Sequence, residues 1–200
     1  MARWLWLAFA LACGRDAAPA GELAVPDVAQ ATDYTCSASA LQGVLAYYEV
    51  TVAEASLATE LGATPQDGAP PEAIARVARV YGLDAAVHDG ATLAELAVEI
   101  AHRRPVIVDL QAWADPPRTT WSEDWDDGHY VVLIAIQGDT LVFEDPSLAG
   151  RRAILTAGEL DVRWHDADAG RRHVHTAIVF HTPPPAHPRA VSVPRRDHMD

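Results

Sequence analysis

The chain has 200 residues, half of them apolar and 22% charged, which is enough for one soluble domain with a sizeable core. Its formal net charge is −13 at pH 7, which argues against nucleic acid as a partner because the phosphate backbone carries the same sign of charge. The two cysteines are too few for a disulfide scaffold in a chain of this size.

Residues 1–20 have the pattern of an export signal. Arg3 precedes an apolar stretch over 4–12, which is too short for a membrane-spanning helix of ~20 residues. The four residues that end at Cys13 resemble a bacterial lipoprotein signal, with Cys13 as the lipid attachment point, and 18–20 is an alternative cleavage site. We expect an exported lipoprotein, which contacts a membrane surface through its lipid, or a periplasmic or extracellular protein; the alternative is a cytoplasmic chain.

Residues 21–182 are expected to form one α+β domain, in which a helical half precedes a mostly antiparallel sheet. Helices are predicted over 36–48 and 72–81. Three more are predicted to follow capping boxes at Thr51, Thr92 and Thr156. All but the helix after Thr156 are expected to form the helical half. Strands are predicted over 83–88, 105–110 and 174–180, with a hairpin over 129–145 and the last strand closing the sheet. Residues 183–200 are rich in proline and predict a flexible tail.

Gln30, Cys36, His129 and Asp145, in that order, indicate an enzyme with a cysteine nucleophile. Cys36 stands at the start of a predicted helix, and a helix N-terminus favours the thiolate, which is the nucleophilic form. His129 can hold the proton and pass it to the leaving group, Asp145 can fix the imidazole tautomer, and Gln30 can donate to the oxyanion. Taken singly, each also fits an ordinary role, as a small buried side chain, a core histidine, a turn former or a loop residue.

The spacing of His129 and Asp145 fits a hairpin. Apolar runs over 131–136 and 140–143 flank a turn at 137–139, and the midpoint between the two residues is position 137. A fold at that point puts the two side chains directly opposite each other, with Cβ atoms ~5 Å apart. A shift of one residue in the pairing would instead put them on opposite faces.

The segment from Gln30 to Cys36, with Leu45-Ala46-Tyr47-Tyr48 after it, resembles the bacteriocin-processing cysteine peptidases, cysteine peptidase family 39. The segments 128–132, around His129, and Asp145-Pro146-Ser147 are similar to the family's His and Asp segments. The resemblance covers roughly residues 25–179. Members are papain-like domains that cut double-glycine leaders and often sit in front of peptide exporters.

The resemblance implies a papain-like fold with the active site between its halves. It also implies cysteine peptidase activity, with Cys36, His129 and Asp145 as the triad and Gln30 as oxyanion donor. Ser37-Ala38 stands where the family usually has Gly-Pro or a similar pair, and no GxxxxGK[ST] motif follows. We therefore expect a stand-alone enzyme, to which the double-glycine specificity does not carry over.

The loop before His129 is a second candidate region. Trp113 precedes it, Trp121 and Trp125 lie within it, and Asp127 is one of its several carboxylates. A loop next to a reactive histidine can shape a substrate cleft, so these four residues are expected to bind substrate. The carboxylates would favour basic peptides or a cation; the alternative is a solvated acidic loop held by buried tryptophans.

A further group has the side chains of a transition-metal site but not the tight spacing of one. We therefore expect no metal and no other cofactor. The group comprises His165, Asp166, Asp168, His173, His175 and His181.

Three functions fit these observations. The first is hydrolysis of a peptide or isopeptide bond in a peptide or protein substrate by a monomeric enzyme. The second is acyl transfer of the transglutaminase type on the same triad, in which the acceptor is an amine. The third is a non-catalytic exported binding protein that uses the tryptophan-rich acidic loop.

Overall fold

The computed structural model describes residues 21–113, 120–168, 170–188, 191 and 195–199. The export signal expected over 1–20, with Cys13, lies outside the described residues, as does the tip of the tryptophan-rich loop at 114–119. Among the residues described, no helix has the length and apolar character needed to cross a membrane.

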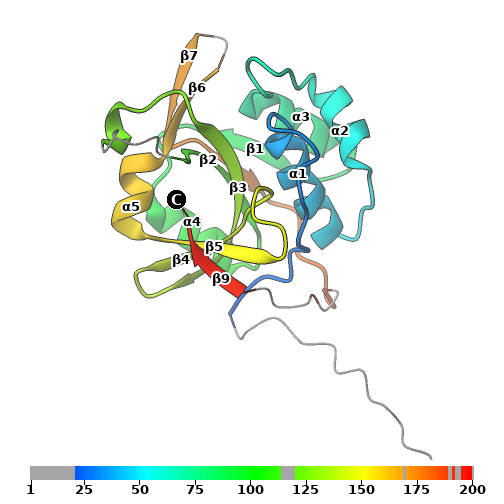
Figure 1. Ribbon diagram of the computed structural model, residues 1–200. Helices are drawn as coiled ribbons and strands as arrows, with labels where there is room; N and C mark the ends of the chain where they lie inside the picture. Colours follow the sequence, from blue (N-terminus) through cyan, green and yellow to red (C-terminus); the bar gives the residue numbers. More distant parts are fainter. Residues whose placement is uncertain (1–20, 114–119, 169, 189–190, 192–194, 200) are drawn as a thin grey trace, which may run out of the picture.

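The centre of the molecule is a curved seven-stranded sheet (Figure 1). All neighbouring strands are antiparallel except the last pair, which is parallel. The order across the sheet is β1 (Ala85–His88), β8 (Ala177–Phe180), β2 (Val106–Gln111), β3 (Gly128–Gln137), β4 (Thr140–Glu144), β5 (Arg151–Thr156) and β9 (Arg195–His198).

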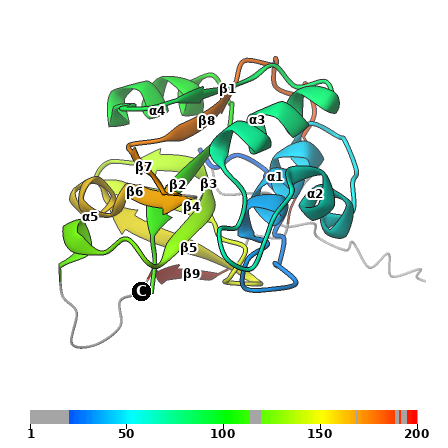
Figure 2. The ribbon, with the colours of Figure 1, turned by 90° about the horizontal axis from the view of Figure 1, so that it is seen from above.

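Helices cover both faces of this sheet (Figure 2). Each face has its own core of buried apolar side chains. The helices α1 (Cys36–Tyr47), α2 (Glu54–Leu61) and α3 (Pro71–Val80) pack on one face. The helices α4 (Leu93–Ala101) and α5 (Ala157–Arg163) lie on the other. Beside the sheet stand the turn η1 (Trp121–Glu123) and a two-stranded hairpin, β6 (His165–Asp168) and β7 (Arg171–Val174).

The α+β class with a mostly antiparallel sheet is confirmed, but three local expectations need correction. The fourth helix does not join the first three, because Leu96 of α4 is buried in the opposite core. Thr51 caps no helix, since α2 begins at Glu54 with Ala53 as its N-cap, whereas the capping boxes of Thr92 and Thr156 are both formed. The strand expected over 174–180 lies between β1 and β2 rather than at an edge.

The proline-rich segment expected to be a flexible tail contributes a strand. β9 pairs in parallel with β5, and Met199 after it is only 2% exposed. Arg151 of β5 pairs with Asp197 of β9 at 2.8 Å, and Arg196 pairs with Glu22. Apolar burial and cross-strand charge pairs thus hold a polar segment that shows little periodicity of its own.

We predict that Met199→Ala lowers the free energy of unfolding by about 2 kcal/mol, because it removes a buried side chain from the core beside β5. Urea unfolding of the full chain measures this. Val174→Ala is the control, since Val174 is 53% exposed and its truncation should change the value by less than ~0.5 kcal/mol. Equal values for the two variants would show that Met199 is not held in the core.

Candidate active site

Cys36 is the first residue of the helix α1, and its side chain is a free thiol that is 7% exposed. No side chain caps this helix, because the Thr35 side-chain oxygen instead accepts from the Thr32 N–H at 3.1 Å. The backbone N–H groups of the first turn of α1 therefore receive no hydrogen bond from a capping side chain. The positive end of the helix dipole favours negative charge at this position.

The segment that carries Gln30 is fixed by backbone hydrogen bonds. The Gln30 N–H donates to the Pro146 carbonyl oxygen at 3.0 Å, and the Ala31 N–H donates to Glu54 Oε1 at 2.9 Å. The Gln30 side chain itself makes no hydrogen bond to any described residue, and its Oε1 is buried. A buried carbonyl oxygen without a partner is an acceptor that a donor group of a ligand can satisfy.

His129 and Asp145 form a buried pair, in which His129 Nε2 lies 2.8 Å from Asp145 Oδ1. The Ser147 N–H and hydroxyl donate to the same Asp145 oxygen at 2.8 and 2.7 Å. Burial raises the pKa of Asp145, but His129 and the Ser147 donors outweigh it, so that the pKa is below its ordinary value. Asp145 is therefore a carboxylate held in one orientation.

His129 interacts electrostatically with both Asp145 and Cys36. Burial lowers the pKa of His129, but the Asp145 carboxylate and the Cys36 side chain together raise it to about 10. Because Nε2 faces Asp145, the buried Nδ1 is the nitrogen left for Cys36, and it makes no hydrogen bond to oxygen or nitrogen. The three side chains thus stand in the sequence thiol, imidazole, carboxylate.

The hairpin brings His129 and Asp145 together by a route that differs from direct opposition. Gln137 pairs with Thr140 across the turn, and this register would put His129 and Asp145 on opposite faces. A β-bulge between Leu133 and Ala135 shifts the register by one residue. Asp145, just past β4, then lies on the face of His129 and diagonal to it, so the expected contact forms although the expected register was wrong.

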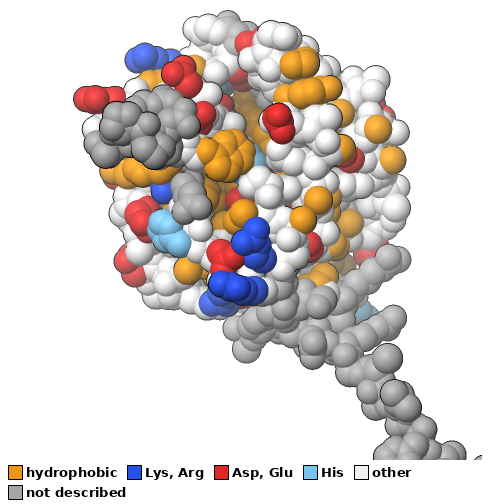
Figure 3. Space-filling model, in the orientation of Figure 1, with side chains coloured by type: hydrophobic (Ala, Val, Ile, Leu, Met, Phe, Trp, Pro, Cys, Tyr) orange, Lys and Arg blue, Asp and Glu red, His pale blue; other side chains and the backbone are white. Residues whose placement is uncertain are grey.

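Two hollows flank this site on one face of the molecule, which Figure 3 shows hollowed between the sheet and the first helices. One, of about 500 Å³, is lined by Gln30, Trp113 and Ser147 among others. The other, of about 200 Å³, is lined by Cys36 and Trp125 among others. Asp33 lines both, so they form neighbouring parts of one cleft.

The tryptophans expected to bind substrate fall in different places. Trp113 is 41% exposed and packs its ring on His129, with centroids 4.6 Å apart, and Trp125 packs on His165 at 4.4 Å. Both line the cleft. Trp121 lies under the Arg163 guanidinium and lines neither hollow, and Asp127 contributes backbone bonds to Gln111 and Ala112.

The six His and Asp residues between His165 and His181 that were considered as metal ligands do not form one cluster. His173 Nε2 lies 3.2 Å from Asp168, and His165 Nε2 lies 2.7 Å from the Asp124 carbonyl oxygen. Within the described residues, no three His, Cys, Asp or Glu side chains gather as a metal site would require. These side chains instead hold the β6–β7 hairpin and the loop before His129.

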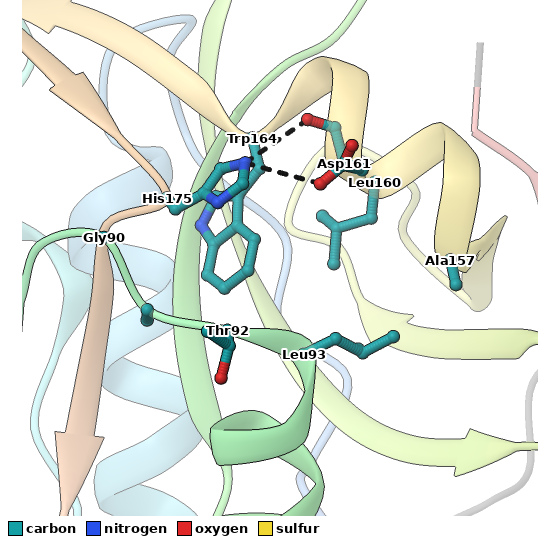
Figure 4. Close-up of a pocket in the computed structure, with 9 residues that line it drawn as sticks. Gly90, Thr92, Leu93, Ala157, Leu160, Asp161, Trp164 and His175 are labelled. Carbon is teal, nitrogen blue, oxygen red and sulfur yellow. Dashed lines mark hydrogen bonds and ion pairs between the residues drawn. The ribbon is translucent and has the colours of Figure 1, made fainter.

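A separate hollow of about 200 Å³ lies between α4 and α5 (Figure 4). In it His175 stacks on Trp164 with centroids 4.8 Å apart, and His175 Nε2 lies 3.7 Å from Asp161 Oδ1. No residue of the Cys36 site lines it. Asp161 therefore offers a carboxylate that can be changed without touching the cleft.

Sequence reasoning did not assign a role to Asp109, Tyr130 or Ser147. Asp109 is a charged residue inside an apolar run, and it is 1% exposed in a strand that is buried at every position. That combination is itself a signal, because carboxylates are almost never fully buried without a reason. Asp109 and Asp166 interact with each other, and Asp109 also interacts with Cys36.

The comparisons with known proteins identify the family of the chain. The family model described as the peptidase C39-like family matches residues 22–168, which is more than half of the chain. The chain belongs to the peptidase C39-like family. No curated protein matches the chain.

Among solved structures, this C39-like chain is similar to a Bacillus anthracis protein described as a C39-like peptidase (19% identity, 80% of this chain, 96% of the other, TM-score 0.59). It is also similar to a double-glycine-motif protease from an AMS/PCAT transporter, solved with the leader peptide (22% identity, 84% of this chain, 98% of the other, TM-score 0.55). A third similar structure is the peptidase domain of Streptococcus ComA, a bifunctional ABC transporter of a quorum-sensing pathway (18% identity, 80% of this chain, 99% of the other, TM-score 0.57). These likenesses show a shared papain-like peptidase fold.

We predict that Asp145→Asn lowers the pKa of His129 from about 10 toward the ordinary ~6.5, because the carboxylate that favours the imidazolium is removed. An NMR titration of the imidazole signals measures it. Asp161→Asn, which removes a carboxylate beside His175, should leave His129 unchanged. A His129 signal that titrates alike in wild type and Asp145→Asn would show that the pair is not electrostatically coupled.

Proposed function

We propose that this C39-like peptidase is a cysteine peptidase that hydrolyses a peptide bond with Cys36 as nucleophile. The observation that carries the proposal is the 2.8 Å contact of His129 with Asp145, beside a thiol at the start of a buried helix. An imidazolium next to the thiol and the N-terminus of α1 both favour the thiolate. Family membership supports the peptidase class, and the residue roles rest on the geometry.

The reaction follows from these positions. The Cys36 thiolate attacks the carbonyl carbon, and the oxyanion is stabilised by the Gln30 side-chain amide and the Cys36 backbone N–H. His129, protonated on Nδ1, gives its proton to the leaving amine, which departs and leaves an acyl-thioester on Cys36. Water then attacks the thioester while His129 takes its proton. This step releases the carboxylate product and restores the thiolate–imidazolium pair.

Asp145 and Trp113 act on His129 rather than on the substrate. Asp145 fixes the ring with Nδ1 toward Cys36, and the Ser147 donors fix Asp145 in turn. Trp113 packs on the imidazole ring and limits the access of water to the His129–Asp145 hydrogen bond. The substrate itself would lie in the cleft along Asp33, which lines both hollows.

We predict that a peptide carrying a thiol-directed electrophile labels Cys36 and that Cys36→Ala abolishes both labelling and turnover. Alkylation by iodoacetamide should be faster in the wild type than in His129→Ala at the same pH, because a neighbouring imidazolium favours the reactive form of a thiol. Peptide mapping of the adduct distinguishes Cys36 from Cys13. His129→Ala should slow labelling and turnover, and equal labelling of the wild type and His129→Ala would contradict a role of His129 at the thiol.

We predict that Gln30→Ala lowers kcat by ~10² or more, because an oxyanion donor acts mainly in the transition state. Alkylation of Cys36 should be nearly unchanged, since it develops no oxyanion. The test is turnover of a peptide selected from a random library by mass spectrometry. Gln137→Ala at the end of β3, away from the cleft, is the matched control and should keep full kcat. Equal effects of Gln30→Ala on alkylation and kcat would indicate a structural role.

A further inference from the structure

Two carboxylates lie beside Cys36 on the side of the cleft away from Gln30. Asp166 lines the 200 Å³ hollow together with Cys36 and Tyr130. Asp109 is opposite Tyr130 in the β2–β3 ladder, so its side chain lies on the same face of the sheet. Asp109 interacts with Asp166 and is close enough to Cys36 for their charges to interact.

The surrounding residues hold Asp166 in place. Gln111 Nε2 donates to Asp166 Oδ1 at 3.0 Å and also to the His165 carbonyl oxygen at 3.0 Å. Gly128, directly before His129, leaves the room that the carboxylate occupies, since a Cβ there would lie 2.1 Å from Asp166 Oδ2. The carboxylate is therefore fixed against the strand that carries His129.

Among the described residues, Asp109 and Asp166 have no positively charged partner. Asp109 is 1% exposed, and burial and the neighbouring Asp166 raise its pKa well above the ordinary value, so Asp109 holds the proton of the pair and Asp166 carries the charge. In the described part of the chain neither Asp109 nor Asp166 takes part in an ion pair, and the described lining of the hollow contains no basic side chain. Buried carboxylates are normally paired with a cation, because removing them from water is costly.

The nearby basic groups are engaged elsewhere. The Arg172 guanidinium lies over the Trp125 ring, 4.2 Å from its centroid, and His165 contacts the Asp124 carbonyl oxygen. The hollow is also smaller than the ~300–1,000 Å³ typical of sites for drug-sized ligands, which suits a single side chain. A cation from outside the chain would complete the pair.

We propose that this hollow is a subsite for a basic side chain of the substrate, lysine or arginine, at a position next to the scissile bond. The inference rests on the proposed peptidase function and names its substrate class. Asp166 lines the subsite and binds the ammonium or guanidinium group, while Asp109 lies beneath it and holds the Asp166 carboxylate in place. A basic side chain of the substrate would offset the negative charge that Asp166 places beside Cys36.

The test compares peptides that differ at one position, with lysine, arginine, norleucine or glutamate placed in turn on each side of the cleavage site. For the wild-type full chain, kcat/KM should be about 10- to 100-fold higher with a basic residue than with norleucine at one position. Asp166→Asn should remove most of this preference, because the amide has the same shape but no charge. Asp109→Asn should weaken the preference less, since Asp109 lies below the hollow.

Asp161→Asn is the matched control, and it should keep the preference and both rates. A wild-type enzyme that cleaves basic and norleucine peptides equally would overturn the subsite. An Asp166→Asn variant that loses both activities in proportion would also overturn it, because the carboxylates would then be structural.

Failure of the proposed function gives a different result. In that case no peptide is cleaved and Cys36 does not react with the electrophilic probe, whichever residue is presented. The subsite is then judged by calorimetric titration of lysine and norleucine peptides into Cys36→Ala. Tighter binding of the lysine peptide that Asp166→Asn abolishes would support the subsite, and equal binding would overturn it.

Discussion

The burial of α1 against β3 is the constraint on which the site depends. Ten of the twelve residues of α1 are buried, and the helix packs on Tyr130, Val132 and Ile134 of β3. A helix that is apolar on nearly every side can lie only in the centre of the domain. The N-terminus of α1, with Cys36, is thereby fixed beside the start of β3, where His129 lies. Packing of the two elements therefore brings the Cys36 thiol and the His129 imidazole together.

The segment before α1 is held with similar firmness. The Val28 N–H donates to Glu144 Oε1 at 3.0 Å, and Arg152 donates to the Val25 carbonyl oxygen at 2.5 Å. Burial raises the pKa of Glu144 to about 8 despite the Val28 hydrogen bond and the charge of Arg152. Glu144 directly precedes Asp145, so one short stretch of chain both anchors the Gln30 segment and orients His129. Gln30 and the His–Asp pair are therefore not independent in structure.

The general architecture could be predicted from the sequence, as could the positions of Cys36 at a helix start and His129 at a strand start, because each has a local signal. A thiol precedes an apolar helix, and His129 opens a strong apolar strand. The β-bulge near Leu133 was not predictable, since no glycine or proline marks it, and it decides on which face Asp145 lies. β9 and the place of Asp109 depend on contacts between distant segments, and local propensity contains no information about them.

The parallel pairing of β9 with β5 also limits how a peptide could be recognised. An exposed edge strand offers a row of backbone N–H and C=O groups to which an extended chain can add. On β5 this row is already used by β9 over Arg151 to Ile154. Recognition by strand addition is thus closed at that position. An extended chain that adds to the sheet would have to pair with one of the two edge strands, β1 or β9.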